Sequence, residues 1–355
     1  MIKEIAVILI NYKEYANKYL ADCLLGIRRQ DCFDNIDLYI VDNSSEEESY
    51  SFLSSQAPEA NIIRNFTNDG FAKGNNDAIR VALGKGAEYI VLLNMDILID
   101  DNKAISELIK TAKSDEKIGV VQSRLMLWPE KDLINSLGNN THFLGFGYCN
   151  NYREKFIDSN NLNNIDIHYP SGAAVLFKSE VLKEIGLFDE SYFMYNEDQD
   201  LGWRAWLANY SCVLAKNSVV YHKYEFSRSI SKYYYMDRNR IITILKNYSM
   251  PTLILIFPAF LLMELGHIYF SIKSGWFLKK VSVWLYFFNP FHINRIIKDR
   301  KIIQRNRKIK DFELIDKISG KIFYQEIESS ALKIGNYFFQ FYFIVVKLII
   351  KLFRF

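Results

Sequence analysis

Residues 89–96 read YIVLLNMD, five apolar residues that lead directly into Asn94 and Asp96. An apolar run without polar alternation indicates a strand buried on both faces of a sheet. Similar runs occur at IAVILI (5–10) and LYIV (38–41), and helical patterns separate them. Strands that alternate with helices predict an α/β fold with a mostly parallel sheet flanked by helices.

Polar residues follow three of these predicted strands. Asn11 follows the first, Asp42 the second, and Asn94 and Asp96 the third. Each could form a local Asx-turn, which is the simpler reading of any one of them. Because ligands bind beyond the carboxyl ends of strands in open α/β sheets, the three together indicate a ligand site.

Asp96 is the candidate metal ligand. A carboxylate beside a buried strand is costly to desolvate unless it meets a cation, and a hard divalent ion prefers oxygen ligands. The alternative is a helix cap, but Asp100 fits the cap of the following helix better. His222 ends the last predicted strand of this region and could complete a metal shell, although a lone histidine is more often structural.

The stretch NDGFAKGNN (68–76) opens a predicted helix and carries Gly70 and Gly74. Glycines allow backbone amides to approach a phosphate, and a helix N-terminus favours negative charge. The spacing matches neither a dinucleotide fingerprint nor a P-loop, so the stretch is a weak signal by itself.

The stretch YNEDQDLGWRAW (195–206) places Glu197, Asp198 and Asp200 at the start of a predicted helix. For this segment alone, the favoured reading is a helix start that suits negative charge, with an ordinary ion pair from Asp200 to Arg204. The rest of the chain must decide whether it does chemistry.

The C-terminal part differs in composition. Residues 251–272 are mostly apolar and would extend about 33 Å as a helix, enough for a bilayer core. Residues 295–310 carry eight Lys or Arg against one Asp, which suits an anionic membrane surface. Glu264 and His267 argue against an isolated membrane span. A buried helical subdomain or an oligomer interface is the alternative, and a homodimer stays open.

The bulk numbers bound the remaining classes. A chain of 355 residues can form one large domain with an appendage or two modest domains. Its four cysteines lack metal-like spacing, so a reducing compartment is the simplest reading. The first apolar run is followed by polar residues and lacks a cleavage pattern, which favours a buried strand over a signal peptide. We expect no nucleic-acid partner.

Taken together, these stretches resemble the family 2 inverting glycosyltransferases of the GT-A fold, particularly the rhamnosyltransferase-like branch that builds surface polysaccharides. The resemblance spans residues 5–222 and is carried by these segments in order: VILINY (7–12), IVDNSS (40–45), NDGFAKGNN (68–76), VLLNMD (91–96), SGAAVLFKSEVLKEIGLFDESYFMYNEDQDLGWR (171–204) and VVYH (219–222).

The resemblance implies a role for each candidate residue. It implies a nucleotide pocket with Asp42 on the base, Asn11 in its lining and Asn94 nearby, and it implies contacts to ribose and diphosphate from the loop that bears Asn68, Gly70, Lys73 and Asn75. It implies Mg²⁺ or Mn²⁺ at Asp96, joined by His222, and Asp198 as the general base. Glu197, Trp203 and Arg204 would shape the acceptor side. Met95 departs from the proline usual in the family, which puts metal dependence in doubt.

The resemblance implies a glycosyltransferase domain at 1–230 and a membrane-associating helical region at 231–355. The expected partners are a nucleotide diphosphate sugar, a lipid-linked saccharide acceptor and a membrane surface. The expected location is the cytoplasmic face of the cell membrane, either peripheral or with an embedded C-terminal segment. Two rivals stay open: a nucleotidyltransferase, disfavoured because residues 11–30 lack a glycine-rich run, and a non-catalytic nucleotide-sugar-binding scaffold.

Overall fold

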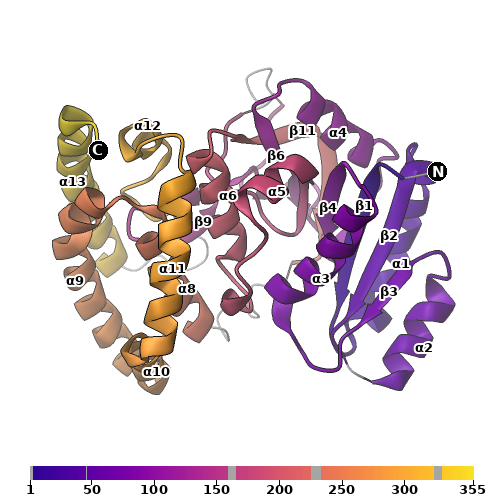
Figure 1. Ribbon diagram of the computed structural model, residues 1–355, viewed down its shortest axis with the longest axis horizontal. Helices are drawn as coiled ribbons and strands as arrows, with labels where there is room; N and C mark the ends of the chain where they lie inside the picture. The colour runs from indigo at the N-terminus through magenta and orange to yellow at the C-terminus, as the bar shows by residue number, and fades with distance from the viewer. Residues whose placement is uncertain (1–2, 45, 159–164, 225–232, 324–329) are drawn as a thin grey trace. The chain divides into compact units, whose positions relative to one another are not determined.

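The computed structural model describes residues 3–44, 46–158, 165–224, 233–323 and 330–355 (Figure 1). The chain divides into two compact units. The first comprises residues 1–139, 149–205 and 210–224, and the second 140–148, 206–209 and 225–355. The predicted boundary between residues 230 and 231 falls outside the described residues.

The first unit is built on a mixed sheet in the order β3-β2-β1-β4-β10-β6-β11-β5, with β7 paired to β6. Its strands are β1 (Ile5–Asn11), β2 (Ile36–Asp42), β3 (Asn61–Arg64), β4 (Tyr89–Leu93), β5 (Ile97–Leu98), β6 (Ile118–Leu127), β7 (Ile134–Ser136), β10 (Ala174–Lys178) and β11 (Ser211–His222).

The sheet is less uniformly parallel than the sequence predicts. Strands β1 to β4 run parallel in the order 3-2-1-4, but β10 is antiparallel to both β4 and β6. The carboxyl ends of β1, β2 and β4 and the amino end of β10 therefore lie at one edge of the sheet. Asn11, Asp42 and Asn94 all lie at or just beyond this edge, as predicted.

Helices cover both faces of this sheet. Helix α1 (Tyr15–Arg28), Leu53 of α2 (Glu47–Gln56) and α4 (Ala104–Lys113) pack on one face against alternate strand residues such as Val7, Leu9 and Val91. Helix α3 (Gly70–Gly84) packs on the other face, where Gly74 approaches Ile10. Continuous apolar strands are explained by this burial on both sides.

The remaining elements complete the list. They are β8 (Asn139–Thr141), β9 (Gly147–Cys149), α5 (Ser179–Ile185), the short η3 turn (Glu190–Tyr192) and α6 (Glu197–Leu207), then α8 (Tyr233–Asn247), α9 (Met250–Lys273), α10 (Phe277–Phe288), α11 (Pro290–Asn306), α12 (Asp311–Leu314) and α13 (Ser330–Phe353).

The second unit is helical, with α8 packed against α10 and α11. The last carbonyls of α8 have no partner within their own helix, and side chains of α11 satisfy them. Arg300 donates to the Leu245 and Tyr248 carbonyls at 2.5 and 2.6 Å, and Gln304 donates to those of Lys246 and Asn247 at 2.9 and 3.0 Å. Part of the basic segment therefore caps a helix.

Candidate active site

The first corner of the site joins Asn11 and Asp42, which pair in register at the ends of β1 and β2. Oδ1 of Asp42 accepts hydrogen bonds from the Asn11 amide, the Ser44 N–H and the Ser49 hydroxyl, each at 3.0 Å. Ala16 N–H, at the start of α1, donates to the Asn11 side chain at 2.9 Å. These contacts fix the orientation of both side chains.

The second oxygen of Asp42, Oδ2, is buried and receives no hydrogen bond from any described residue. Leaving a buried carboxylate oxygen unsatisfied costs free energy, on the order of 1–3 kcal/mol or more for a charged group. A ligand N–H or O–H at this position would remove that cost. Asp42 therefore offers a built acceptor at the sheet edge, as the nucleotide-binding prediction requires.

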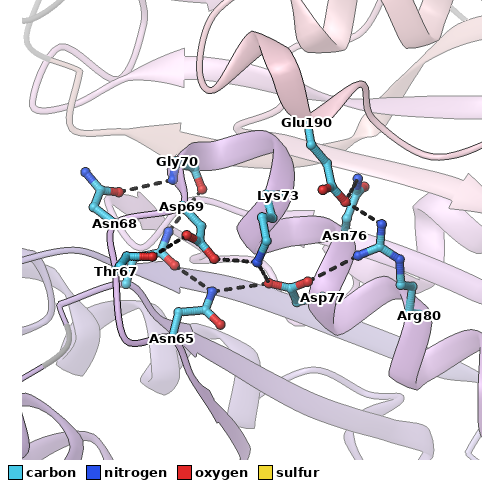
Figure 2. A network of polar contacts seen from close by, with 11 residues as sticks. Asn65, Thr67, Asn68, Asp69, Gly70, Lys73, Asn76, Asp77, Arg80 and Glu190 are labelled. Atoms are coloured by element: carbon cyan, nitrogen blue, oxygen red, sulfur yellow. Dashed lines mark hydrogen bonds and ion pairs between the residues drawn. The ribbon is translucent and has the colours of Figure 1, made fainter. Parts of the chain in front are cut away.

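The second corner is the loop before α3, which Figure 2 shows as a network of polar contacts. Asn68 accepts a hydrogen bond from the Gly70 N–H at 3.1 Å. The Lys73 ammonium pairs with both Asp69 and Asp77. A contact from Lys73 to a diphosphate, as the sequence predicts, would require these ion pairs to open.

The first amides of α3 also have a partner. Phe71 N–H and Ala72 N–H both donate to the Phe193 carbonyl, at 2.7 and 3.2 Å. Gly70 has a φ of 76°, and a Cβ built there would lie 2.4 Å from that same carbonyl. Asn75 is buried and donates to the Phe71 carbonyl at 2.9 Å. In this structure the loop supports the segment around residue 193.

Helix α3 is also tied to the segment at residues 188–190, and Figure 2 shows its contacts with Glu190. The Asn76 amide donates to the Phe188 carbonyl at 2.8 Å and accepts from the Phe188 N–H at 3.1 Å. Glu190 accepts from Asn76 at 3.1 Å and pairs with Arg80. Helix α3 therefore supports the segment of chain that leads to α6.

That segment is conformationally unusual. Phe193, Tyr195 and Asn196 have φ values of 64°, 67° and 64°, in a backbone region that residues other than glycine seldom adopt. Such residues persist where the surrounding structure determines them, and they cluster at functional sites. The hydrogen bonds from α3 to the Phe193 carbonyl support the first of these residues, in the segment that leads to Glu197 and Asp198.

Asp198 lies in the first turn of α6, and backbone donors hold its carboxylate. Gly172 N–H donates to Oδ2 at 3.1 Å, and Gln199 N–H donates to Oδ1 at 2.8 Å. Burial raises the pKa of Asp198 to about 6, and these N–H groups limit the rise. Asp198 is therefore mostly ionised at neutral pH, with a proton affinity suited to a general base.

Glu197 is buried beside Asp198 and has a different protonation state. Burial, followed by the charge of Asp198, raises the pKa of Glu197 well above its usual value. Its Oε2 is buried and has no hydrogen-bond partner among the described residues. The pair thus keeps one neutral acid next to one carboxylate.

The third corner brings Asp96 and His222 together. Nε2 of His222 lies 3.3 Å from Oδ1 of Asp96, and both residues are buried. Nδ1 of His222 lies 2.9 Å from the side-chain oxygen of Asn135, in β7. Since that amide oxygen can only accept, Nδ1 carries a proton, and Nε2 is the ring nitrogen that faces the Asp96 carboxylate.

The Asp96 carboxylate and Nε2 of His222 are both atom types that ligate divalent metal ions. A nitrogen and a carboxylate oxygen from these residues fit a divalent ion, and an imidazole oriented by its second nitrogen is the usual arrangement at metal sites. The residues present therefore fit the predicted metal. Asn135 was not predicted to lie in the site, because it falls in residues 126–170, which are rich in Asn and Gly and show no clear helix or strand pattern.

Hydrogen bonds connect the region around Asp198 to the strand end that leads to Asp96. The Gly172 N–H donates to Asp198. The carbonyl of the next residue after Gly172, Ala173, accepts from the Asn94 N–H at 2.9 Å, and Asp96 lies two residues beyond Asn94. The antiparallel strand β10 creates this link, because its amino end meets the carboxyl end of β4. Carboxylates about a hundred residues apart in sequence thus belong to one edge of one sheet.

Trp203 and Arg204 differ from the sequence expectation of acceptor contact. Trp203 is fully buried, with its ring against His168. Arg204 is 7% exposed and pairs with Asp200 at 2.9 Å. Its other guanidinium nitrogens donate to the carbonyls of Ile185, Gly186 and Leu187 at 2.7–3.2 Å. A side chain with all of these internal partners holds the fold of the segment before α6.

A family model and a curated relative both match this chain. A model of the family described as glycosyl transferase family 2 matches residues 6–186. The low-salt glycan biosynthesis hexosyltransferase Agl10 of Haloferax volcanii is 25% identical over 217 residues, which cover 58% of this chain and 62% of that protein. The chain thus spans less than two thirds of this curated relative.

One solved structure with a TM-score of 0.50 supports the fold at low sequence identity, and a second is a weaker match. The crystal structure of GalNAc-T7 with UDP, GalNAc and Mn²⁺ has a TM-score of 0.50 at 11% identity, and the match covers 66% of this chain and 47% of that one. The mannosyltransferase PcManGT from Pyrobaculum calidifontis, in complex with GDP-Man and Mn²⁺, has a TM-score of 0.47 at 14% identity, with coverages of 98% and 87%. The predicted GT-A type α/β fold is confirmed.

Proposed function

Because the chain belongs to glycosyl transferase family 2, we propose that it transfers a hexose or deoxyhexose, with rhamnose as the first candidate, from a nucleoside diphosphate to an acceptor hydroxyl. The Agl10 relative, a hexosyltransferase of glycan biosynthesis, supports the sugar class. The observation that carries the proposal is the base-like Asp198 on the same sheet edge as the Asp96–His222 pair.

In this proposal the donor nucleotide binds beside Asn11 and Asp42, whose free Oδ2 accepts a hydrogen bond from the base. Asn94 and Asn68 lie along the path of the ribose and diphosphate. Gly70, Lys73 and Asn75 lie in the first turns of α3 and act through the shape of this helix start, since their hydrogen-bond donors are already engaged within the fold. Glu197 contributes a neutral hydrogen-bond donor on the acceptor side.

The proposed reaction inverts the anomeric carbon. The Asp198 carboxylate takes the proton of the acceptor hydroxyl while that oxygen bonds to the anomeric carbon. The bond from this carbon to the diphosphate oxygen breaks, and the nucleoside diphosphate leaves. Asp96 and His222 would hold Mg²⁺ or Mn²⁺, which supplies charge neutralisation of the leaving diphosphate when bound.

We propose that residues 1–230 carry this chemistry and that residues 231–355 bring it to a lipid-linked saccharide at the cytoplasmic face of a membrane. Two helices support membrane association by length and composition, α9 and residues Ile334–Phe353 of α13. The proposed acceptor class follows from this, because a membrane-bound transferase meets acceptors anchored in lipid. A homodimer stays a prediction.

The test uses the purified full chain with UDP, GDP and dTDP sugars, with and without Mn²⁺. Ligands that bind the native state raise its melting temperature, so a shift with one nucleotide class identifies the donor. Mass spectrometry of a lipid-linked acceptor must then show the mass of one added sugar. Binding without transfer to any acceptor would favour the scaffold alternative, and stabilisation by no nucleotide would reject the proposal.

A further inference from the structure

Large apolar side chains of the second unit are exposed along one face of α13. Among them are Ile334, Tyr337, Phe341, Leu348 and Leu352, with exposed fractions of 63–76%. Their spacing repeats at three, four or seven residues, as on one face of a helix. The opposite face is buried, with Phe339, Phe343, Val346 and Ile350. The exposed stripe is therefore separate from the core of the unit.

Helix α9 carries a second such stripe. Ile254, Phe257, Leu261, Leu265 and Tyr269 have exposed fractions of 49–69% and the same helical spacing. Figure 1 shows α9 and α13 on the same side of α8 and α11 within this unit. An apolar surface of this extent seldom faces water and marks a binding surface.

The inner side of α9 is fixed to neighbouring helices by a buried ionic cluster. Glu264 pairs with Arg240 of α8 and with Lys280 of α10, and Asp237 pairs with the same two cations. Lys280 and Arg240 are at most 1% exposed. Two carboxylates and two cations balance, and burial lowers the pKa of the adjoining His267 so that it is neutral.

Polar contacts also hold α13 to its neighbours, at two points along its length. Asn336 donates to the Ile322 carbonyl at 2.8 Å and accepts from the Ile322 N–H at 2.9 Å. Further along, Lys347 and Lys351 pair with Asp316 at 2.6 and 2.5 Å. These contacts show that the segment at 316–322 lies along α13, so a crossing α13 would carry this segment into the apolar interior of the bilayer, which is costly.

We infer that α9 and α13 lie along the surface of an anionic phospholipid bilayer, with their exposed stripes inserted in one leaflet, and that neither helix crosses it. Charge supports this partner: between residues 250 and 298 the only acidic residue is the paired Glu264, while Lys273 and Lys279 are exposed. The inference rests on the membrane association proposed above and deepens it.

The test measures the depth of three positions along α9. One cysteine at a time is introduced at Ile254, Leu261 or Tyr269 and labelled with an environment-sensitive fluorophore, in a full chain with Cys32 and Cys149 replaced by serine and with the buried Cys23 and Cys212 retained. The protein is bound to phosphatidylcholine vesicles that contain phosphatidylglycerol, and lipids with quenchers at different depths are added. We expect the same shallow depth for all three. A central label deeper than both ends would show a crossing helix and overturn the inference.

A second measurement separates this inference from the enzymatic one. Phe341→Ser and Leu348→Ser together should weaken vesicle binding about tenfold or more, because each large apolar side chain contributes about 1.5–3 kcal/mol on burial. The melting temperature should stay unchanged. Phe66→Ser is the control, since Phe66 is 82% exposed in the first unit. Equal vesicle binding by all variants, or an apolar face covered by self-association without vesicles, would overturn the inference while nucleotide binding stands.

Discussion

Two buried acidic groups of this protein have opposite electrostatic environments. In the first unit no lysine or arginine pairs with Glu197 or Asp198 among the described residues, and the pKa of Asp198 is raised to about 6. In the second unit Arg240 and Lys280 surround Asp237 and Glu264, and the cations hold the pKa of Asp237 far below its usual range. The comparison distinguishes a carboxylate kept available for proton transfer from one that is neutralised to hold helices together.

The largest effect is expected from removing the Asp198 carboxylate, which has no lysine or arginine partner among the described residues. For Asp198→Asn we expect kcat to fall about 10²–10⁴-fold, because a general base is lost. Nucleotide affinity should stay within a few fold, since the proposed role of this side chain is toward the acceptor and its described partners are the backbone N–H groups of Gly172 and Gln199. The control is Asp100→Asn, which removes an exposed carboxylate paired with Lys131. Activity of the Asp198 variant near wild type would reject its role as base.

Removing one cation from the buried cluster around Asp237 and Glu264 should lower the stability of the folded protein. Lys280→Met leaves Asp237 and Glu264 partly uncompensated in the interior, and removing one partner of a buried ion pair costs about 3–5 kcal/mol. Calorimetry should show a lower melting temperature for the variant. Lys279→Met is the matched control, since Lys279 is exposed and adjacent. Equal melting temperatures would show that the cluster does not stabilise the helices.

Asp96 is an intermediate case, because a histidine faces it where lysine and arginine face Asp237. For Asn135→Leu we expect Mn²⁺ affinity to fall about 10–100-fold, since groups that orient a metal-bound histidine have effects of that size. Asn135→Asp retains an acceptor for Nδ1–H and should keep the affinity. Electron paramagnetic resonance of free Mn²⁺ measures both without an activity assay. An unaffected leucine variant would remove Asn135 from the site.

The smallest expected effect is on the pH profile. With a pKa of about 6, the Asp198 carboxylate is roughly one tenth ionised at pH 5 and nine tenths ionised at pH 7. Because the base must be ionised to accept a proton, kcat/KM should rise about tenfold over this interval and then level. A profile that falls from pH 5 to pH 7 would contradict this protonation state.

The sequence predicted the site at the level of the sheet. Continuous apolar runs predict strands that are buried on both faces of a sheet. The ends of three such runs, at Asn11, Asp42 and Asn94, therefore predicted strand ends at one edge of the sheet. The reversed direction of β10 was not predicted, since a short apolar run carries no information about strand polarity. That reversal is what brings Gly172, and with it Asp198, to the edge.

Side-chain partners were less accessible to sequence reasoning. The spacing of Arg204 from Asp200 predicted their ion pair, but not the three carbonyls that take up the rest of the guanidinium. Lys73 looked available to a phosphate, yet Asp69 and Asp77 lie four residues to either side of it. Asn135 and His222 are 87 residues apart, and only strand pairing brings them together.

The carbonyl of Phe193 that caps α3 has a kinetic consequence. A donor phosphate that bound the amides of Phe71 and Ala72 would have to displace this carbonyl, and the backbone from Phe193 to Asp198 would move with it. The first substrate to arrive would thereby set the position of the proton acceptor used by the second. Initial-rate and product-inhibition patterns should accordingly show a compulsory sequence, with the nucleotide sugar entering first and the nucleoside diphosphate leaving last.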